Sequence, residues 1–285
     1  MLKPMLAATL EDIKSLRFPI YASYKLDGVR ATIQNGLVLS RNLKPLPNME
    51  VQGMFGHLES CDGEIVVGDA NKAGVLQRTV SLVMSQKMGE TEEVKFWVFD
   101  ILRSKEGYEK RYEQVARRVE GERWARKLAQ TVIESKEELE EFEVKAVNGG
   151  YEGVMVRAPN APYKHGRSTT REGYLVKIKR WDIDEGEVVR CETLMHNANE
   201  ATINELGRTV RSSKKEGKEE VGMLGALVIK TNKGQTVNVG SGFTMSQRVE
   251  MWNTRGSLVG RKVRFKHFPY GEVDAPRSPI FMELV

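Results

Sequence analysis

Cysteine and histidine are scarce in this chain of 285 residues, which contains two cysteines and four histidines. Cys61 and Cys191 lie far apart and neither belongs to a C-x-x-C pair, so we expect neither a disulfide framework nor a zinc site. The histidines lack the spacing of metal ligands, which argues against a metal held by histidine. A reducing compartment fits this composition best.

Long apolar segments are also missing. No run is long enough to span a membrane, and the apolar part of residues 1–6 is too short for a secretory signal. Hydrophobic residues nevertheless make up 40% of the chain, enough for real cores. We therefore expect a cytoplasmic, intracellular protein with no membrane partner.

Charge of one sign is only mildly in excess. The net charge is +5, and residues 186–285 carry 15 Lys or Arg against 11 Asp or Glu, which is +4 of that total. Near the end of this region the cations are clustered, and the cluster is either a solvated face or a surface that follows phosphates. It consists of Arg261, Lys262, Arg264 and Lys266.

The common phosphate-binding loops are absent. No G-x-x-x-x-G-K-[ST] loop occurs, since Gly217-Lys218 is followed by Glu219, and no G-x-G-x-x-G follows a strand. Any nucleotide chemistry in this chain must therefore use another scaffold.

The first part of the sequence mixes strands and helices, and Asp27-Gly28 indicates a hairpin turn between its first two strands. Apolar runs predict strands, and spaced apolar residues predict helices. The strands are expected over 20–26, 29–34, 62–67, 94–102, 154–157 and 174–179, and the helices over 73–85, 108–128 and 137–147.

The second part has short strand-like runs separated by turn residues, which is typical of a five-stranded Greek-key barrel. These runs cover 188–191, 227–230, 236–239 and 262–268. We expect an α+β protein with two domains, one over residues 1–183 and a small all-β domain over 184–285.

The segment Lys25-Leu26-Asp27-Gly28 has two interpretations. It is either a hairpin with charged flanks or the site of a nucleophilic lysine. A lysine amine attacks phosphorus only when it is deprotonated, and partial burial beside other cations would lower its pKa.

Further segments supply groups that such a lysine needs. Lys177 and Lys179 are two residues apart, so a strand would place both on one face, where a polyanion would offset their repulsion. The others, in chain order, are Ser40-Arg41-Asn42, Asp62-Gly63-Glu64-Ile65, Phe96-Trp97-Val98-Phe99-Asp100 and Glu152-Gly153-Val154-Met155-Val156-Arg157.

In this order the segments resemble the covalent nucleotidyltransferase superfamily, which comprises ATP-dependent DNA ligases, RNA ligases and mRNA capping enzymes. The resemblance covers nearly all of residues 20–180 and implies an antiparallel-sheet nucleotidyltransferase (adenylation) domain followed by an OB-fold domain. Residues 199–208, 240–244 and 276–281, with Met5-Leu6-Ala7 near the start, are similar to segments of the short bacteriophage-type DNA ligases. An RNA ligase or a capping-type enzyme that uses the same lysine remains the alternative.

The resemblance implies that ATP adenylates Lys25 and that the AMP then passes to the 5′-phosphate of a nick, with Mg²⁺ or Mn²⁺ present. Glu64 and Glu152 would bind the metal, and Glu64 alternatively the ribose hydroxyls. Phe99 would stack on adenine, whereas Trp97, the next candidate, is favoured as a core residue. The other implied ATP or AMP contacts are Ser23, Arg30, Arg41, Arg171, Lys177 and Lys179.

The resemblance also implies a monomer that acts on nicked duplex DNA. The segment 208–218 is either a disordered charged tip or a DNA contact, as the cluster at 261–266 is either a solvated face or a DNA contact. Larger ligases have a terminal R-x-D-K-type motif that is missing here, so we expect the first step either to be organised differently or to be slower. The candidate DNA contacts are Arg208, Arg211, Lys214, Lys215, Arg261, Lys262, Arg264 and Lys266.

Overall fold

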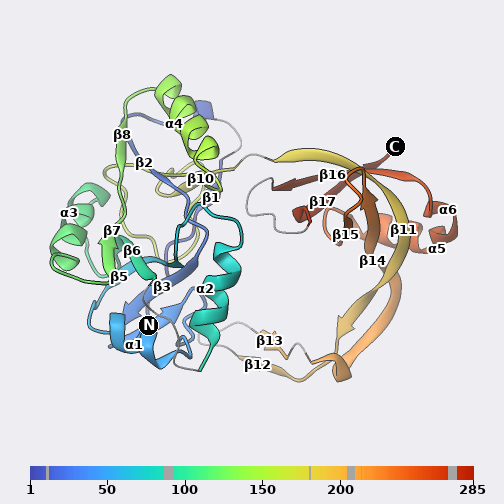
Figure 1. The fold of residues 1–285 in the computed structure, drawn as a ribbon, viewed down its shortest axis with the longest axis horizontal. Coiled ribbons are helices and arrows are strands. Elements are labelled where there is room, and N and C mark those ends of the chain that lie inside the picture. Colours follow the sequence, from blue (N-terminus) through green and yellow to red (C-terminus); the bar gives the residue numbers. More distant parts are fainter. Residues whose placement is uncertain (11–12, 87–92, 180, 204–208, 213, 269–274) are drawn as a thin grey trace. The chain divides into compact units, whose positions relative to one another are not determined.

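The computed structural model describes all residues except 11–12, 87–92, 180, 204–208, 213 and 269–274 (Figure 1). Its contacts divide the chain into two compact units, one over Met1–Lys179 and the other over residues 180–285. Strand β11 starts at Asp182 and pairs within the second unit, which explains why the contacts divide before the boundary that we expected after residue 183.

In the first unit, the described residues form two five-stranded sheets, with the strand orders β4-β3-β5-β6-β7 and β1-β10-β9-β2-β8. Most neighbours are antiparallel, and β1–β10 and β6–β7 are parallel. The strands are β1 Ala8–Thr9, β2 Ile20–Tyr24, β3 Val29–Gln34, β4 Leu37–Ser40, β5 Cys61–Val67, β6 Val94–Ile101, β7 Ala125–Lys127, β8 Thr131–Ile133, β9 Val154–Arg157 and β10 Val176–Ile178.

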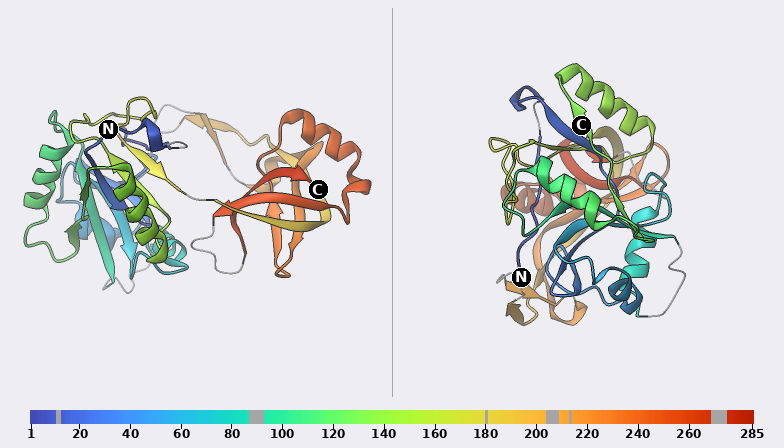
Figure 2. Two further views of the ribbon diagram at one scale, coloured as in Figure 1. Left: turned by 90° about the horizontal axis from the view of Figure 1, so that it is seen from above. Right: turned by 90° about the vertical axis from the view of Figure 1, so that its left-hand side faces the viewer.

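Helices cover both sheets (Figures 1 and 2). Helix α2 packs against β5 and α3 against β6, whereas α4 packs against β8 and β9 of the other sheet. Each sheet has its own apolar cluster, with Phe55, Ile65 and Phe96 fully buried in one and Ala22 and Val156 fully buried in the other. The helices are η1 Ile13–Ser15, α1 Met49–Phe55, α2 Val75–Met84, α3 Tyr108–Arg118 and α4 Lys136–Asn148.

The predicted hairpin around Asp27-Gly28 is wrong. Strands β2 and β3 belong to different sheets, so this segment is a crossover between them. The chain passes so close to β5 here that a Cβ on Gly28 would lie 2.2 Å from the carbonyl oxygen of Ile65. The glycine is therefore required by this close approach.

The predicted helix over 108–128 is wrong in its second half. Helix α3 ends at Arg118, and Gly121 then adopts a φ of 74° that a helix does not allow. Ala125 is fully buried in β7, which pairs with β6. Tertiary pairing thus overrides the spaced pattern of charged residues that indicated a helix.

The second unit is the OB-like barrel that the sequence indicated, and α5 and α6 accompany its strands. The sheet has the order β15-β14-β11-β16-β17, its two end strands also contact each other, and Ser241, just after β15, forms a parallel bridge with Ile280 of β17. A hairpin of β12 and β13 extends from it (Figure 1). The elements are β11 Asp182–Asn197, β12 Ala201–Ile203, β13 Thr209–Arg211, η2 Lys215–Gly217, β14 Lys218–Thr231, β15 Thr236–Val239, α5 Met245–Asn253, α6 Arg255–Leu258, β16 Lys262–Phe268 and β17 Arg277–Leu284.

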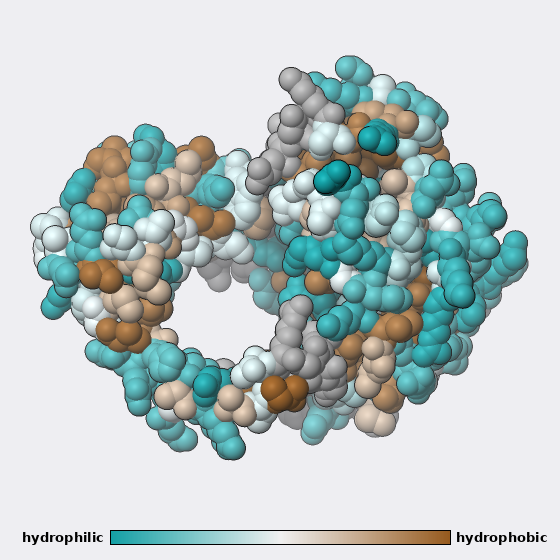
Figure 3. All heavy atoms as spheres, turned by 180° about the vertical axis from the view of Figure 1, so that it is seen from behind, coloured by the Kyte–Doolittle hydropathy of each residue, from teal (hydrophilic) through white to brown (hydrophobic). Residues whose placement is uncertain are grey.

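The visible surface of both units is mostly hydrophilic, with hydrophobic residues in scattered patches (Figure 3). Among the residues that the structure describes, no helix has the length and apolar character needed to cross a membrane.

Candidate active site

A row of paired positions crosses the sheet that contains β2. Lys177 of β10 pairs with Met155 of β9, and Met155 pairs with Ser23 of β2. Strand β8 pairs with β2 on the other side, and its register continued by one residue places Gln130 opposite Ser23. Since paired residues point to the same face of a sheet, these four side chains form one line.

This line borders a cavity of about 220 Å³ in the first unit. Seven residues that the sequence predicted as ATP or AMP contacts line it. They are Ser23, Lys25, Arg30, Arg41, Glu64, Phe99 and Lys177.

Lys25 stands directly after β2, and its backbone N–H donates to the carbonyl oxygen of Gly153 at 2.8 Å. Its amine forms an ion pair with Glu152, which also pairs with Lys179. Glu152 is 6% exposed, so this carboxylate is held in place by two lysines largely out of solvent. Glu152 and Lys179 therefore meet at Lys25, although they do not line the cavity.

Cations crowd one end of the cavity. Burial lowers the pKa of Lys177, and the nearby charges of Lys25, Arg167 and Arg41 lower it further. Like charges gathered in a concave site favour an anionic ligand, because its charge offsets their repulsion. The cavity is thus suited to a polyphosphate.

Acidic groups set the other charges of the site. Asp62, fully buried, accepts two hydrogen bonds from Arg30, of 2.6 and 2.7 Å, and a third of 2.5 Å from the hydroxyl of Tyr163. Burial raises the pKa of Glu64 to about 7, against the lowering effect of Lys25 and Arg30. Near neutral pH, Glu64 therefore takes up or releases a proton readily.

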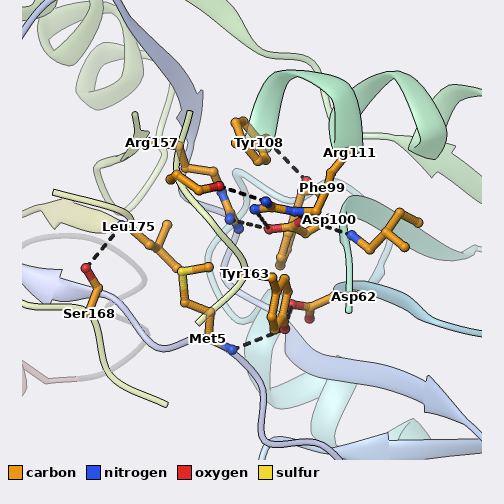
Figure 4. A network of polar contacts seen from close by, with 12 residues as sticks. Met5, Asp62, Phe99, Asp100, Tyr108, Arg111, Arg157, Tyr163, Ser168 and Leu175 are labelled. Carbon is orange, nitrogen blue, oxygen red and sulfur yellow. Dashed lines mark hydrogen bonds and ion pairs between the residues drawn. The ribbon is translucent and has the colours of Figure 1, made fainter. Parts of the chain in front are cut away.

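Behind the cavity, Asp100 lies between two arginines (Figure 4). Arg111 Nε donates to Oδ1 at 2.6 Å and Arg157 Nη1 donates to Oδ2 at 2.5 Å, and all three residues are buried. The guanidinium carbon of Arg157 also lies 5.3 Å from the centre of the Phe99 ring. This network fixes the strand end that presents Phe99 to the cavity.

Two predicted residues are placed elsewhere. Arg171 is exposed and does not line the cavity, whereas Arg167 of the same segment does. Trp97 packs with Leu26 and Val66 in a small apolar cluster, as its alternative role as a core residue required.

Several cavity residues escaped the sequence reasoning. Arg157 ends the segment that begins with Glu152, in which only the glutamate was predicted to act, and Gln130 and Leu128 belong to no motif. The pairing of β8 with β2, which is non-local, brings Gln130 to the site, so no local signal could have found it.

The candidate DNA contacts are in the second unit. The outward positions of β16 carry Lys262, Arg264 and Lys266, while the residues between them are buried. Arg264 is already paired, with Glu185 at 2.8 Å and Glu283 at 2.6 Å, and these hydrogen bonds raise its pKa. Arg261 is exposed just before the strand.

The other candidates lie on or after the hairpin of β12 and β13. Arg211, Lys214 and Lys215 are exposed, and Arg208 lies outside the described residues. Asn199 ties this segment down by donating to the carbonyl oxygens of Lys214, at 2.9 Å, and Ser212, at 3.2 Å.

Comparison with family models identifies the family to which the chain belongs. The family model described as ATP dependent DNA ligase domain matches residues 4–179, more than half of the chain. The chain belongs to the ATP-dependent DNA ligase family. A second family model, the DNA ligase OB-like domain, matches residues 216–284 of this ligase. It is therefore an enzyme that seals nicks in DNA with ATP, through a lysyl-AMP and then an adenylated 5′-phosphate, as this family does with a divalent metal ion. The RNA-ligase and capping alternatives are not favoured.

Solved structures agree. The Chlorella virus DNA ligase-adenylate is 29% identical over 99% of both chains, with a TM-score of 0.56. A Lig E DNA ligase is 22% identical over 99% of this chain and 98% of that one, with a TM-score of 0.75. The DNA ligase of bacteriophage T7, in complex with ATP, is 15% identical over 99% and 98% with a TM-score of 0.52. The last two likenesses concern the fold alone. A comparison with curated proteins found no match.

Proposed function

We propose that Lys25 is the lysine that this ligase adenylates. The observation that carries the proposal is its position, in a cavity where Arg41, Arg167 and Lys177 gather positive charge around it. The Lys25 amine attacks the α-phosphorus of ATP, the bond to pyrophosphate breaks, and the proton of the amine is lost. Glu152 is paired with that amine and is placed to hold the proton.

The next two transfers move the AMP from Lys25 to the DNA and then join the DNA ends. An oxygen of the 5′-phosphate at the nick attacks the phosphorus of the lysyl-AMP, and Lys25 leaves with a proton. The 3′-hydroxyl then attacks the 5′-phosphorus and loses its proton to solvent, the bond to AMP breaks, and AMP leaves as the new phosphodiester forms. The protein mainly positions the groups and neutralises charge in such in-line displacements.

Each remaining role follows from a position in the cavity, except that of Lys179, which follows from its ion pair with Glu152 beside Lys25. Lys177, Arg41 and Arg167 would neutralise phosphate charge, with Arg167 taking the role that was predicted for Arg171. Phe99 would stack on the base and Ser23 would contact its edge. Arg30 would contact ribose or phosphate, and Lys179 would hold Glu152 and assist the leaving group.

The acidic residues of the cavity do not by themselves supply a full set of ligands for a divalent cation. Among the described residues no group of three or more potential ligand side chains occurs. Mg²⁺ is commonly held by one or two carboxylates plus substrate phosphates, and Glu64 and Glu152 provide such a pair beside Lys25. They would hold the ion together with the nucleotide, and it would supply charge neutralisation at phosphate.

Duplex DNA would be bound in part by the second unit. Arg261, Lys262 and Lys266 are better candidates than Arg264, whose charge is offset by two glutamates. Replacing those three by alanine should weaken binding of a nicked duplex and reduce its salt dependence, since fewer counterions are released. Arg264→Ala should change the salt dependence less.

We also propose that the ligase acts as a monomer inside the cell. Both cysteines are free, and Cys61 is buried, as a reducing compartment allows. Sedimentation equilibrium with and without nicked DNA would measure the protein mass, and a stable dimer would contradict this part of the proposal.

Mass spectrometry after incubation with ATP and Mg²⁺ tests the central claim. We expect an AMP adduct on Lys25, and none after Lys25→Ala. That variant should still seal a nick that is already adenylated, whereas the exposed-lysine control Lys3→Ala should behave as wild type. An adduct on another lysine, or label from GTP alone, would overturn the assignment.

A further inference from the structure

The cavity has two chemically different ends. Lys177 lies at the cationic end, and Gln130 lies three strand spacings away along the line Lys177–Met155–Ser23–Gln130. With strands about 4.8 Å apart, this is roughly 14 Å, which is a length on the scale of a nucleotide. If phosphate occupies the cationic end, the base reaches toward Gln130.

Gln130 is held firmly in this place. The hydroxyl of Tyr112 accepts from the backbone N–H of Gln130 at 3.1 Å and donates to the carbonyl oxygen of Leu128 at 2.9 Å. The N–H of Leu128 in turn donates to the carbonyl oxygen of Val98 at 2.8 Å. The segment that joins β7 to β8 is thus braced from both sides.

The side-chain amide of Gln130 has an unsatisfied hydrogen-bond acceptor. Its Oε1 is shielded from solvent and has no hydrogen-bond partner among the described residues, and because the residue lines the cavity, rotation of its side chain would bring this oxygen to a ligand there. A buried acceptor without a donor is unfavourable, because it has lost its hydrogen bonds to water and gained none in return. Ser23 and Arg157, which also line the cavity, have side-chain donors, but neither bonds to this oxygen.

We infer that Gln130 reads the 6-amino edge of the adenine base of ATP. A carboxamide matches adenine, because its oxygen accepts from the 6-amino group while its nitrogen donates to N1. Together with Ser23, Gln130 then determines the preference for a purine that has a 6-amino group. Tyr112 is a positioning residue, which acts through the backbone of Gln130. The inference rests on the proposed role of this cavity as the ATP site of Lys25.

Changing the ligand and the protein together tests this contact. The rate of AMP or analogue transfer to Lys25 is measured over a range of concentrations of ATP and of purine riboside triphosphate, which has hydrogen in place of the 6-amino group. Wild type should prefer ATP by about tenfold in kcat/KM, as one hydrogen bond of about 1.4 kcal/mol gives. Gln130→Leu should reduce that preference to within about twofold, by losing ATP and not the analogue.

Two further variants separate contact from packing. Gln130→Glu keeps an acceptor oxygen and should retain most of the preference, whereas Tyr112→Phe should lose part of it. If Gln130→Leu adds the nucleotide to Lys25 with undiminished preference, or if Ser23→Ala alone abolishes the preference, the inference is overturned. Absence of any adduct on Lys25 in wild type would instead refute the proposed function.

Discussion

Asp62 accepts hydrogen bonds from Arg30 with both carboxylate oxygens, from Nε to Oδ1 at 2.6 Å and from Nη2 to Oδ2 at 2.7 Å, although the two residues are 32 positions apart. The same carboxylate accepts from Tyr163, whose hydroxyl also accepts from the backbone N–H of Met5 at 3.1 Å. Arg30 Nη2 donates to the carbonyl oxygen of Met5 at 3.2 Å. One buried carboxylate thus connects the N-terminal segment with an arginine of the cavity that Lys25 lines.

Asp62→Asn should destabilise the ligase by about 3 kcal/mol, because it leaves the poorly exposed Arg30 without a counter-charge. Urea unfolding measures this loss. The double variant Asp62→Asn/Arg30→Gln should recover much of the stability, since it removes both charges of this pair, and yet transfer AMP to Lys25 slowly. Recovery of fast AMP transfer in the double variant would mean that Arg30 does not contact the nucleotide.

Glu64→Gln should stabilise the protein without nucleotide at pH 8 and change little at pH 4.5. Burial raises the pKa of Glu64 to about 7, so the folded chain binds this proton more tightly than the unfolded chain. The resulting stability is complete below about pH 4.5 and is lost as the pH rises through about 7. The Glu64→Gln variant has no such proton to lose, so it keeps this stability at high pH. We expect its free energy of unfolding at pH 8 to exceed that of wild type by about 2 kcal/mol, allowing for the partial exposure of Glu64. Thermal melts across this pH range measure it, and a less stable variant at pH 8 would contradict the prediction.

Lys177→Met should raise the melting temperature of the protein without nucleotide at neutral pH. The pKa of Lys177 is lowered by burial and by neighbouring cations, so keeping it charged costs stability, and that cost disappears above the ordinary lysine pKa. AMP transfer to Lys25 should fall roughly 100-fold, as when a preorganised charge is removed. Calorimetry gives the melting temperature and adduct formation gives the rate of AMP transfer, both on the same samples. A variant with both a lower melting temperature and a lower rate would contradict the prediction.

Gly153→Ala should disrupt the site through the backbone. Gly153 has a φ of 150°, and an added Cβ would lie 2.2 Å from the carbonyl oxygen of Ile178. Its own carbonyl holds Lys25, and Glu152 is its neighbour, so both should shift. We expect a loss of about 3 kcal/mol in urea unfolding together with loss of AMP transfer. Gly53→Ala, in helix α1 with no atom within 4 Å of the added Cβ, is the matched control and should gain up to about 1 kcal/mol.

Local patterns predicted most elements of the first unit, because apolar runs and caps are written in neighbouring residues. Helices α2 and α4 fall where spaced apolar residues indicated them, and α4 begins after Ser135, which accepts from the N–H of Glu138. The two errors have one cause. The crossover at Asp27-Gly28 and the strand β7 depend on pairing with distant segments, which a local pattern does not contain.

By itself the sequence determined the chemistry: an ordered set of segments that offers a lysine, carboxylates, an aromatic ring and further cations for nucleotidyl transfer. The tertiary structure decided which of these groups meet. It brought Arg167 rather than Arg171 to the cavity, and it placed Gln130 in line with Ser23. The physical reason is that strand register and sheet order are set by contacts between segments far apart in the chain, where the alignment of one strand selects which side chains share a face.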